Sequence, residues 1–163
     1  MENLLKEYQI AHVGYITEDL DKVVARVTEL YEIDDWYVFE WTPSRVWYKG
    51  ENRDDYRLKI ALSLPATGEG TRFEIIQPLT EGLHMDFLKA GTQTISHICH
   101  VVKDFDAALK QFLDNGCELV FESEYTDDIR GYRRCHYVYD PIMNNMVEIA
   151  EIPYFRNEKG ERI

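Results

Sequence analysis

The chain has 163 residues, a hydrophobic content of 45% and a formal net charge of −12 at pH 7. This size allows one core or two small fused cores, and the charge argues against nucleic acid or an anionic membrane as the main partner. Every apolar run is shorter than the roughly 18 residues that span a bilayer, and three cysteines without CxxC spacing predict reduced thiols. We therefore expect a cytoplasmic protein that acts on a small molecule.

The first module, residues 1–78, begins with a strand followed by a helix. Residues 9–16 are predicted to form the strand, and Asp19 suits the N-cap of a helix that reaches Tyr31. Apolar residues at spacings of three and four mark the buried face of this helix: Leu20, Val23, Val24, Val27 and Leu30. Alternating apolar residues then predict further strands: 36–42, 56–64 and 71–77.

The same order restarts after a linker with a short helix, residues 79–94. A second module, residues 95–153, is predicted to hold a strand, a helix from Asp104 to Asp114 and three more strands, followed by a charged tail at 154–163. The sequence thus predicts an α+β fold of two tandem βαβββ modules. Their eight strands are expected to form a cupped mixed sheet with the helices on its outer face.

An internal repeat relates the two modules. IAHVGYITED at residues 10–19 is answered by ISHICHVVKD at 95–104, so His12 corresponds to His97. RFEIIQP at 72–78 is answered by MVEIAEIP at 146–153, so Glu74 corresponds to Glu148. The histidines are 85 positions apart and the glutamates 74, so about eleven extra residues are expected within 36–56 of the first module. We interpret them as a lid or substrate wall, or as a longer hairpin.

The four repeated residues predict a metal site. Strand alternation places each of them on the face opposite its apolar neighbours, and a polar side chain inside an apolar strand is costly unless it is paired or bound to metal. A single histidine or glutamate there is commonly a satisfied core residue, but duplicated pairs favour a ligand set. Two histidines and two glutamates suit a divalent first-row metal, namely zinc, nickel, cobalt, manganese or iron.

Four motifs in order resemble the vicinal oxygen chelate superfamily, nearest to its methylmalonyl-CoA epimerase and glyoxalase I branches. The motifs are HVGYITEDLD, RFEIIQPL, FLKAGTQTISHICHVVKD and DPIMNNMVEIAE. The resemblance implies paired βαβββ modules around one metal held by His12, Glu74, His97 and Glu148. It also implies a lyase or isomerase that enolises a metal-chelated carbonyl substrate, with Glu148 or Glu74 moving the proton. We also expect a homodimer.

The chain departs from both branches. Asp54 and Asp55 stand where epimerases carry a Glu-Gln-Gly-type segment that supplies a second acid or base. Tyr15 and Glu18 stand near the first ligand, where glyoxalase I carries an arginine for glutathione. Glutathione is therefore not the expected substrate.

Five further residues are predicted to bind substrate. Arg130 and Arg133 belong to a basic cluster that suits a carboxylate or phosphate, although Asp127 and Asp128 can neutralise it in a solvated hairpin. Trp41 and Trp47 suit a pocket wall or, alternatively, a core or dimer interface. Cys99 shares the predicted face of His97 and suits either substrate contact or small buried filling.

Two other functions remain open. An Fe(II)-dependent ring-cleaving dioxygenase needs two histidines and one carboxylate, a subset of the predicted ligands. A non-catalytic drug-sequestering protein of the bleomycin-resistance type would use an acidic, aromatic cleft for a cationic drug.

Overall fold

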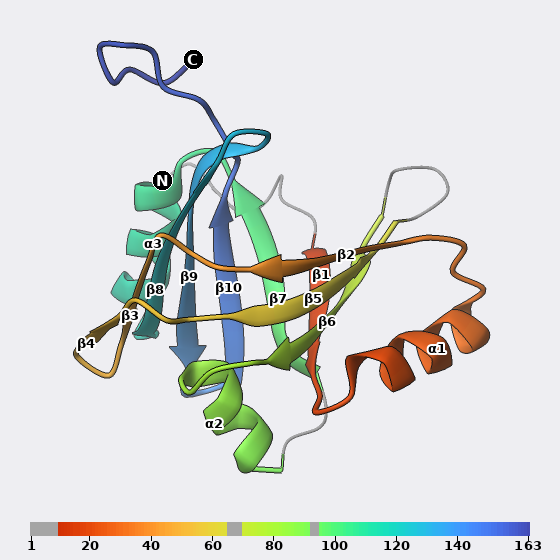
Figure 1. The fold of residues 1–163 in the computed structure, drawn as a ribbon. Helices are drawn as coiled ribbons and strands as arrows, with labels where there is room; N and C mark the ends of the chain where they lie inside the picture. Colours follow the sequence, from red (N-terminus) through yellow and green to blue (C-terminus); the bar gives the residue numbers. More distant parts are fainter. Residues whose placement is uncertain (1–9, 65–69, 92–94) are drawn as a thin grey trace. The chain divides into compact units, whose positions relative to one another are not determined.

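The computed structural model describes residues 10–64, 70–91 and 95–163, in which it places ten strands and three helices (Figure 1). These residues divide into two units. The N-terminal unit comprises Ile10–Thr42 and Asp55–Cys99, and the C-terminal unit comprises Pro43–Asp54 and His100–Ile163. Strand β7 (Ile95–Val102) runs through the boundary. Among the described residues, no helix has the length and apolar character needed to cross a membrane.

The N-terminal unit contains five strands in the order β2-β5-β6-β1-β7. β1 and β6 are parallel, whereas β5 pairs antiparallel with both of its neighbours. The elements that lie within the unit are β1 (Ile10–Ile16), α1 (Leu20–Tyr31), β2 (Trp36–Trp41), β5 (Leu58–Ser63), β6 (Arg72–Pro78) and α2 (Leu83–Lys89).

Helix α1 packs on the face of this sheet opposite Glu74. Asp19 caps the helix as predicted, because its carboxylate accepts a hydrogen bond from Lys22 N at 3.1 Å. Leu20 packs with Ala61 and Ile75 in a buried cluster. Since Ile75 neighbours Glu74 on β6, strand alternation directs the glutamate to the other face. The helix therefore buries one side of the sheet and leaves the other for the predicted ligands.

The C-terminal unit contains β7 and five further strands in the order β7-β10-β9-β8-β3-β4. Asp104 caps its helix through a hydrogen bond from Ala107 N to the carboxylate, 3.1 Å. The elements are β3 (Arg45–Tyr48), β4 (Glu51–Arg53), α3 (Phe105–Asp114), β8 (Glu118–Asp127), β9 (Gly131–Asp140) and β10 (Asn145–Glu151).

The predicted number of strands, eight, is wrong: the described residues form ten. The two additional strands are β3 and β4, a hairpin inserted between β2 and β5 of the first module. β3 pairs antiparallel with β8 (Figure 1). In this pairing Trp47 is opposite Glu122. The extra length expected within 36–56 is thus a hairpin, and it extends the sheet of the C-terminal unit by covering the edge of β8.

The predicted fold class is confirmed. Without the inserted hairpin, the chain runs β1-α1-β2-β5-β6 and then β7-α3-β8-β9-β10, which is βαβββ twice. The sheet is mixed, because the β1–β6 pair is parallel and the other described pairs are antiparallel.

Candidate metal centre

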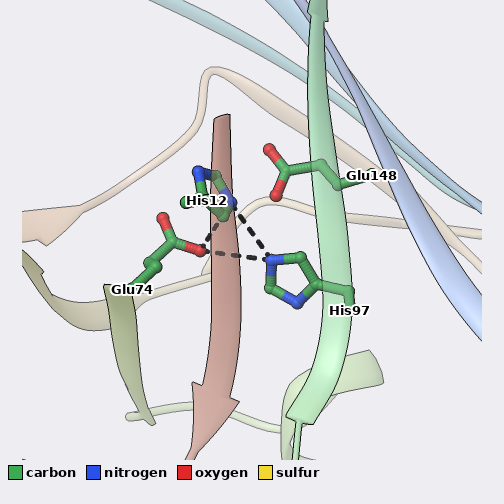
Figure 2. Close-up of side chains that lie close together, drawn as sticks. All are labelled: His12, Glu74, His97 and Glu148. Atoms are coloured by element: carbon green, nitrogen blue, oxygen red, sulfur yellow. Dashed lines mark hydrogen bonds and ion pairs between the residues drawn. The ribbon is translucent and has the colours of Figure 1, made fainter. Parts of the chain in front are cut away.

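Three residues of the N-terminal unit bring their acceptor atoms together (Figure 2). β1 places Gly14 beside Glu74 of β6, so His12, two residues earlier, projects from the same face as the carboxylate. His12 Nε2 lies 3.2 Å from Glu74 Oε2, and His97 Nε2 lies 3.3 Å from the same oxygen. The two Nε2 atoms are 3.2 Å apart. Exposed fractions of 8%, 9% and 1% for His12, Glu74 and His97 show a nearly buried cluster.

Gly14 provides the space that His97 occupies. A Cβ atom at Gly14 would lie 1.9 Å from His97 Cε1 and 2.4 Å from its Nδ1, far inside van der Waals contact. The imidazole therefore fills the volume that a side chain on β1 would need. Position 99, which corresponds to Gly14 in the repeat, holds a cysteine, so this close approach exists in one copy only.

Ser96 determines which nitrogen of His97 can bind a metal. Its Oγ lies 3.0 Å from the carbonyl oxygen of Gly14 and 3.0 Å from His97 Nδ1. Because a carbonyl only accepts, the hydroxyl proton goes to Gly14, and Oγ accepts a hydrogen bond from Nδ1–H. His97 Nε2 then carries its lone pair toward His12 and Glu74, as a metal ligand requires.

The donor set fits a divalent metal. His97 Nε2 and Glu74 Oε2 are both acceptors in a nearly dry site, so positive charge is needed between them. Ligands bound at about 2.1 Å to one ion lie about 3.0 Å apart in octahedral geometry and about 3.4 Å apart in tetrahedral geometry. The three separations, 3.2, 3.2 and 3.3 Å, fall within that range. In the metal-free protein, a proton on His12 Nε2 would take the place of the metal between these acceptor atoms.

Glu148 belongs to the C-terminal unit, where two side chains hold its carboxylate. The thiol of Cys135 donates to Oε1 at 2.9 Å, and the hydroxyl of Tyr137 donates to Oε2 at 3.2 Å. Glu148 is 4% exposed, so these are buried hydrogen bonds to a group that costs much to desolvate. Figure 2 draws Glu148 with the three N-terminal residues.

The two predicted tryptophans differ in position: Trp41 lies on the sheet face that carries Glu74, whereas Trp47 does not lie on the face that carries Glu148. Trp41 is opposite Leu58 on β5, on the face that carries Glu74, since Leu62 of the same strand is opposite that glutamate. Tyr48 is opposite Phe121, Phe121 is opposite Tyr137, and Tyr137 is opposite Glu148, so Tyr48 shares the face of Glu148. Trp47, the neighbour of Tyr48 on β3, therefore projects from the other face. Its position gives no support to contact with a substrate near Glu148.

The two predicted arginines also differ. Arg130 is engaged within its hairpin: Nε donates to Asp127 at 2.9 Å, and a terminal nitrogen donates to the Tyr125 hydroxyl at 2.8 Å. Burial opposes the charge of Arg130, but the hydrogen bonds and charge interactions with Asp127 and Tyr125 together outweigh this effect and raise the arginine pKa. Arg133 shares a face of β9 with Cys135, which contacts Glu148. Of the pair, Arg133 is better placed for a substrate anion.

Cys99 is fully buried, two residues beyond His97 on β7. This burial supports the alternative prediction of a small filling residue and leaves no exposed thiol for solvent.

Four residues that support the cluster and Glu148 were not predicted: Gly14, Ser96, Cys135 and Tyr137. The repeat could have identified two of them, because Gly14 aligns with Cys99 and Ser96 aligns with Ala11. A position at which the two copies differ is one where the residue has a different role in each copy. Cys135 and Tyr137 had no such signal, since their role depends on the register of β9 against β10.

Solved structures similar to this chain include several enzymes and a hypothetical protein. Methylmalonyl-CoA epimerase from Mycobacterium tuberculosis is 20% identical, with 87% of this chain and 86% of that chain covered and a TM-score of 0.58. A mutant of 4-hydroxymandelate synthase from Streptomyces coelicolor is 15% identical, with coverages of 92% and 50% and a TM-score of 0.60. A hypothetical protein from Bacillus halodurans is 16% identical, with coverages of 96% and 99% and a TM-score of 0.60.

These likenesses show the fold, and this chain spans about half the length of the hydroxymandelate synthase. No curated protein matches the sequence. The family model described as glyoxalase/bleomycin resistance protein/dioxygenase superfamily matches residues 11–135, a range that includes His12, Glu74 and His97. The chain belongs to the glyoxalase/bleomycin resistance protein/dioxygenase superfamily.

Proposed function

We propose that this protein is a divalent-metal-dependent lyase or isomerase that moves a proton beside a carbonyl group of a small substrate. The observation that carries the proposal is the cluster of His12, Glu74 and His97, whose acceptor atoms lie 3.2 to 3.3 Å from one another. Its imidazoles and carboxylate suit zinc, nickel, cobalt, manganese or iron.

Glu148 is proposed as the fourth ligand and as the group that moves the proton. It is assigned this role because it occupies the repeat position of Glu74. Hydrogen bonds from Cys135 and Tyr137 orient its carboxylate independently of a metal. A bound metal would polarise a substrate carbonyl and make the adjacent carbon acid enough for a carboxylate to deprotonate.

The methylmalonyl-CoA epimerases among the structural neighbours agree with this class of reaction. The epimerase is an isomerase by its name, and its fold covers most of both chains. Its substrate is not carried over to this chain, because an identity of 20% supports the fold alone.

The test is elemental analysis of the purified protein, followed by proton exchange. We expect about one transition-metal ion per chain, and deuterium uptake from D₂O beside the carbonyl of α-hydroxyketones or acyl thioesters. Removal of the metal with a chelator should stop the exchange, and its return should restore it. A folded protein that takes up no metal from solutions of the five candidate ions would rule the proposal out.

A ring-cleaving dioxygenase is the second candidate. The specific observation in its favour is that two histidines and one carboxylate already cluster within the N-terminal unit, as the facial triad of Fe(II) oxygenases requires. Oxygen consumption by the Fe(II)-loaded protein with a catechol distinguishes it from the first candidate. Uptake of O₂ without deuterium exchange would favour the dioxygenase.

Replacing Ser96 by alanine is expected to weaken metal binding about tenfold, the lower end of the range for loss of a group that orients a ligand histidine. Without the hydroxyl, Nδ1 of His97 loses its acceptor and the ring is free to adopt the other tautomer. Titration calorimetry with Zn²⁺ measures the change. Ser96→Thr is the matched control, because it keeps the hydroxyl and should keep most of the affinity; equal affinities for wild type and Ser96→Ala would contradict the assigned tautomer.

A further inference from the structure

An aromatic row on β2 lies on the same face of the N-terminal sheet as the side-chain cluster of His12, Glu74 and His97. Its members are Tyr37, Phe39 and Trp41. Tyr37 is directly opposite Leu62 of β5, and Leu62 is directly opposite Glu74 of β6. Directly opposed residues in a sheet share a face, so the row continues the surface that begins at Glu74.

The row offers a flat, partly open surface. The rings of Tyr37 and Phe39 are stacked, with centroids 4.8 Å apart and planes inclined by 26°. Tyr37 is 45% exposed, in contrast to 9% for Glu74, so the outer end of the row has area that a ligand can cover. The side chains between row and carboxylate, Leu62 and Ile60, are apolar. The β2 members of this face carry no charge, so it suits a planar apolar group better than a phosphate or carboxylate.

The spacing sets the length of a matching ligand. Neighbouring strands are about 4.8 Å apart, so a group above Leu62 lies about one strand spacing from Tyr37 and about one from Glu74. A ring in that position needs one or two bonds between itself and a carbonyl carbon if the carbonyl oxygen is to reach a metal at the cluster.

We propose that the substrate carries an aromatic ring one or two bonds from the carbonyl carbon of its metal-binding group, and that this ring packs against Tyr37 and Phe39 above Leu62. The inference rests on the proposed function, since it names the substrate class of the same metal site. Contacts between the substrate ring and an existing pair of stacked rings extend the offset arrangement that aromatic side chains prefer.

Hydroxamates provide the test, because each presents two metal-binding oxygens next to a variable group. Calorimetry on the Zn²⁺-loaded protein compares acetohydroxamate, phenylacetohydroxamate and cyclohexylacetohydroxamate. We expect the phenyl compound to bind about tenfold more tightly than the methyl compound and clearly more tightly than the cyclohexyl compound. Equal binding of the phenyl and cyclohexyl compounds would overturn the preference for an aromatic ring.

Two variants assign the effect to the row. Tyr37→Ala should remove most of the phenyl preference and leave acetohydroxamate binding unchanged. Val38→Ala is the matched control, because Val38 is 49% exposed, opposite Ala61 and on the other face of the same strand. An undiminished phenyl preference in Tyr37→Ala would refute the inference. Absence of Zn²⁺ binding in the wild type would instead refute the proposed function, so the two failures are distinguishable.

Discussion

Replacing Gly14 by alanine is expected to abolish metal binding at the cluster, with a loss of affinity of at least about 100-fold, the upper end of the range for disturbed support of a metal ligand. The new Cβ would lie 1.9 Å from Cε1 of His97, so the imidazole has to leave its position. That ring also accounts for one of the three acceptors and for the hydrogen bond to Ser96. One methyl group thus removes a ligand and its support together.

Titration calorimetry with Zn²⁺ measures the affinity, and thermal unfolding of the metal-free protein measures the stability. We expect Gly14→Ala to cost about 1 to 3 kcal/mol of stability through overpacking. Val13→Ala is the control, since Val13 neighbours Gly14 on β1 but projects from the other face; it should lower the stability and preserve metal binding. Unchanged affinity in a folded Gly14→Ala protein would show that His97 is not a ligand.

The sequence was sufficient to predict the two modules because each carries its own local signals. Apolar residues at helical spacing follow Asp19 and Asp104, and both aspartates cap helices as expected. The repeat then aligned His12 with His97, and that alignment made two isolated histidines into one prediction. Internal duplication supplied the comparison that a single copy lacks.

The number of strands was wrong because pairing between distant segments has no local signal. Residues 45–53 have a hairpin pattern, but nothing in them specifies β8, about seventy residues later, as the partner of β3. The same limit explains Tyr137, whose place opposite Glu148 follows from the β9–β10 register. The sequence predicts which residues alternate on a strand, whereas the neighbouring strand determines what they meet.

The surroundings of the two repeated glutamates are unequal, although the sequence presents them as equivalent. Glu74 Oε2 lies within 3.3 Å of both ligand-type nitrogens, His12 Nε2 and His97 Nε2. Glu148 accepts hydrogen bonds from Cys135 and Tyr137. Tyr137 lies directly opposite Glu148, whereas the residue directly opposite Glu74 is the apolar Leu62. Two such donors can hold the Glu148 carboxylate in one orientation without a metal, as the proton-transfer role proposed for it would require.

Glu148→Gln is therefore expected to lower the rate of substrate proton exchange about 1,000-fold at saturating metal, within the range for loss of a general base. An amide keeps an oxygen for metal coordination but has no basic oxygen to accept the proton. Glu74→Gln is the matched variant: it should weaken Zn²⁺ binding, yet at saturating Zn²⁺ its exchange rate should stay within about tenfold of wild type.

Deuterium uptake by NMR, in whichever carbonyl compound the wild type exchanges, measures both rates, and calorimetry confirms that the metal is bound in each variant. The contrast between the variants is the informative result, because both replacements remove one negative charge from a nearly buried glutamate. If Glu74→Gln lost the exchange and Glu148→Gln kept it, the roles of the two carboxylates would be reversed. Equal losses would mean that the hydrogen bonds from Cys135 and Tyr137 do not distinguish the base from the ligand.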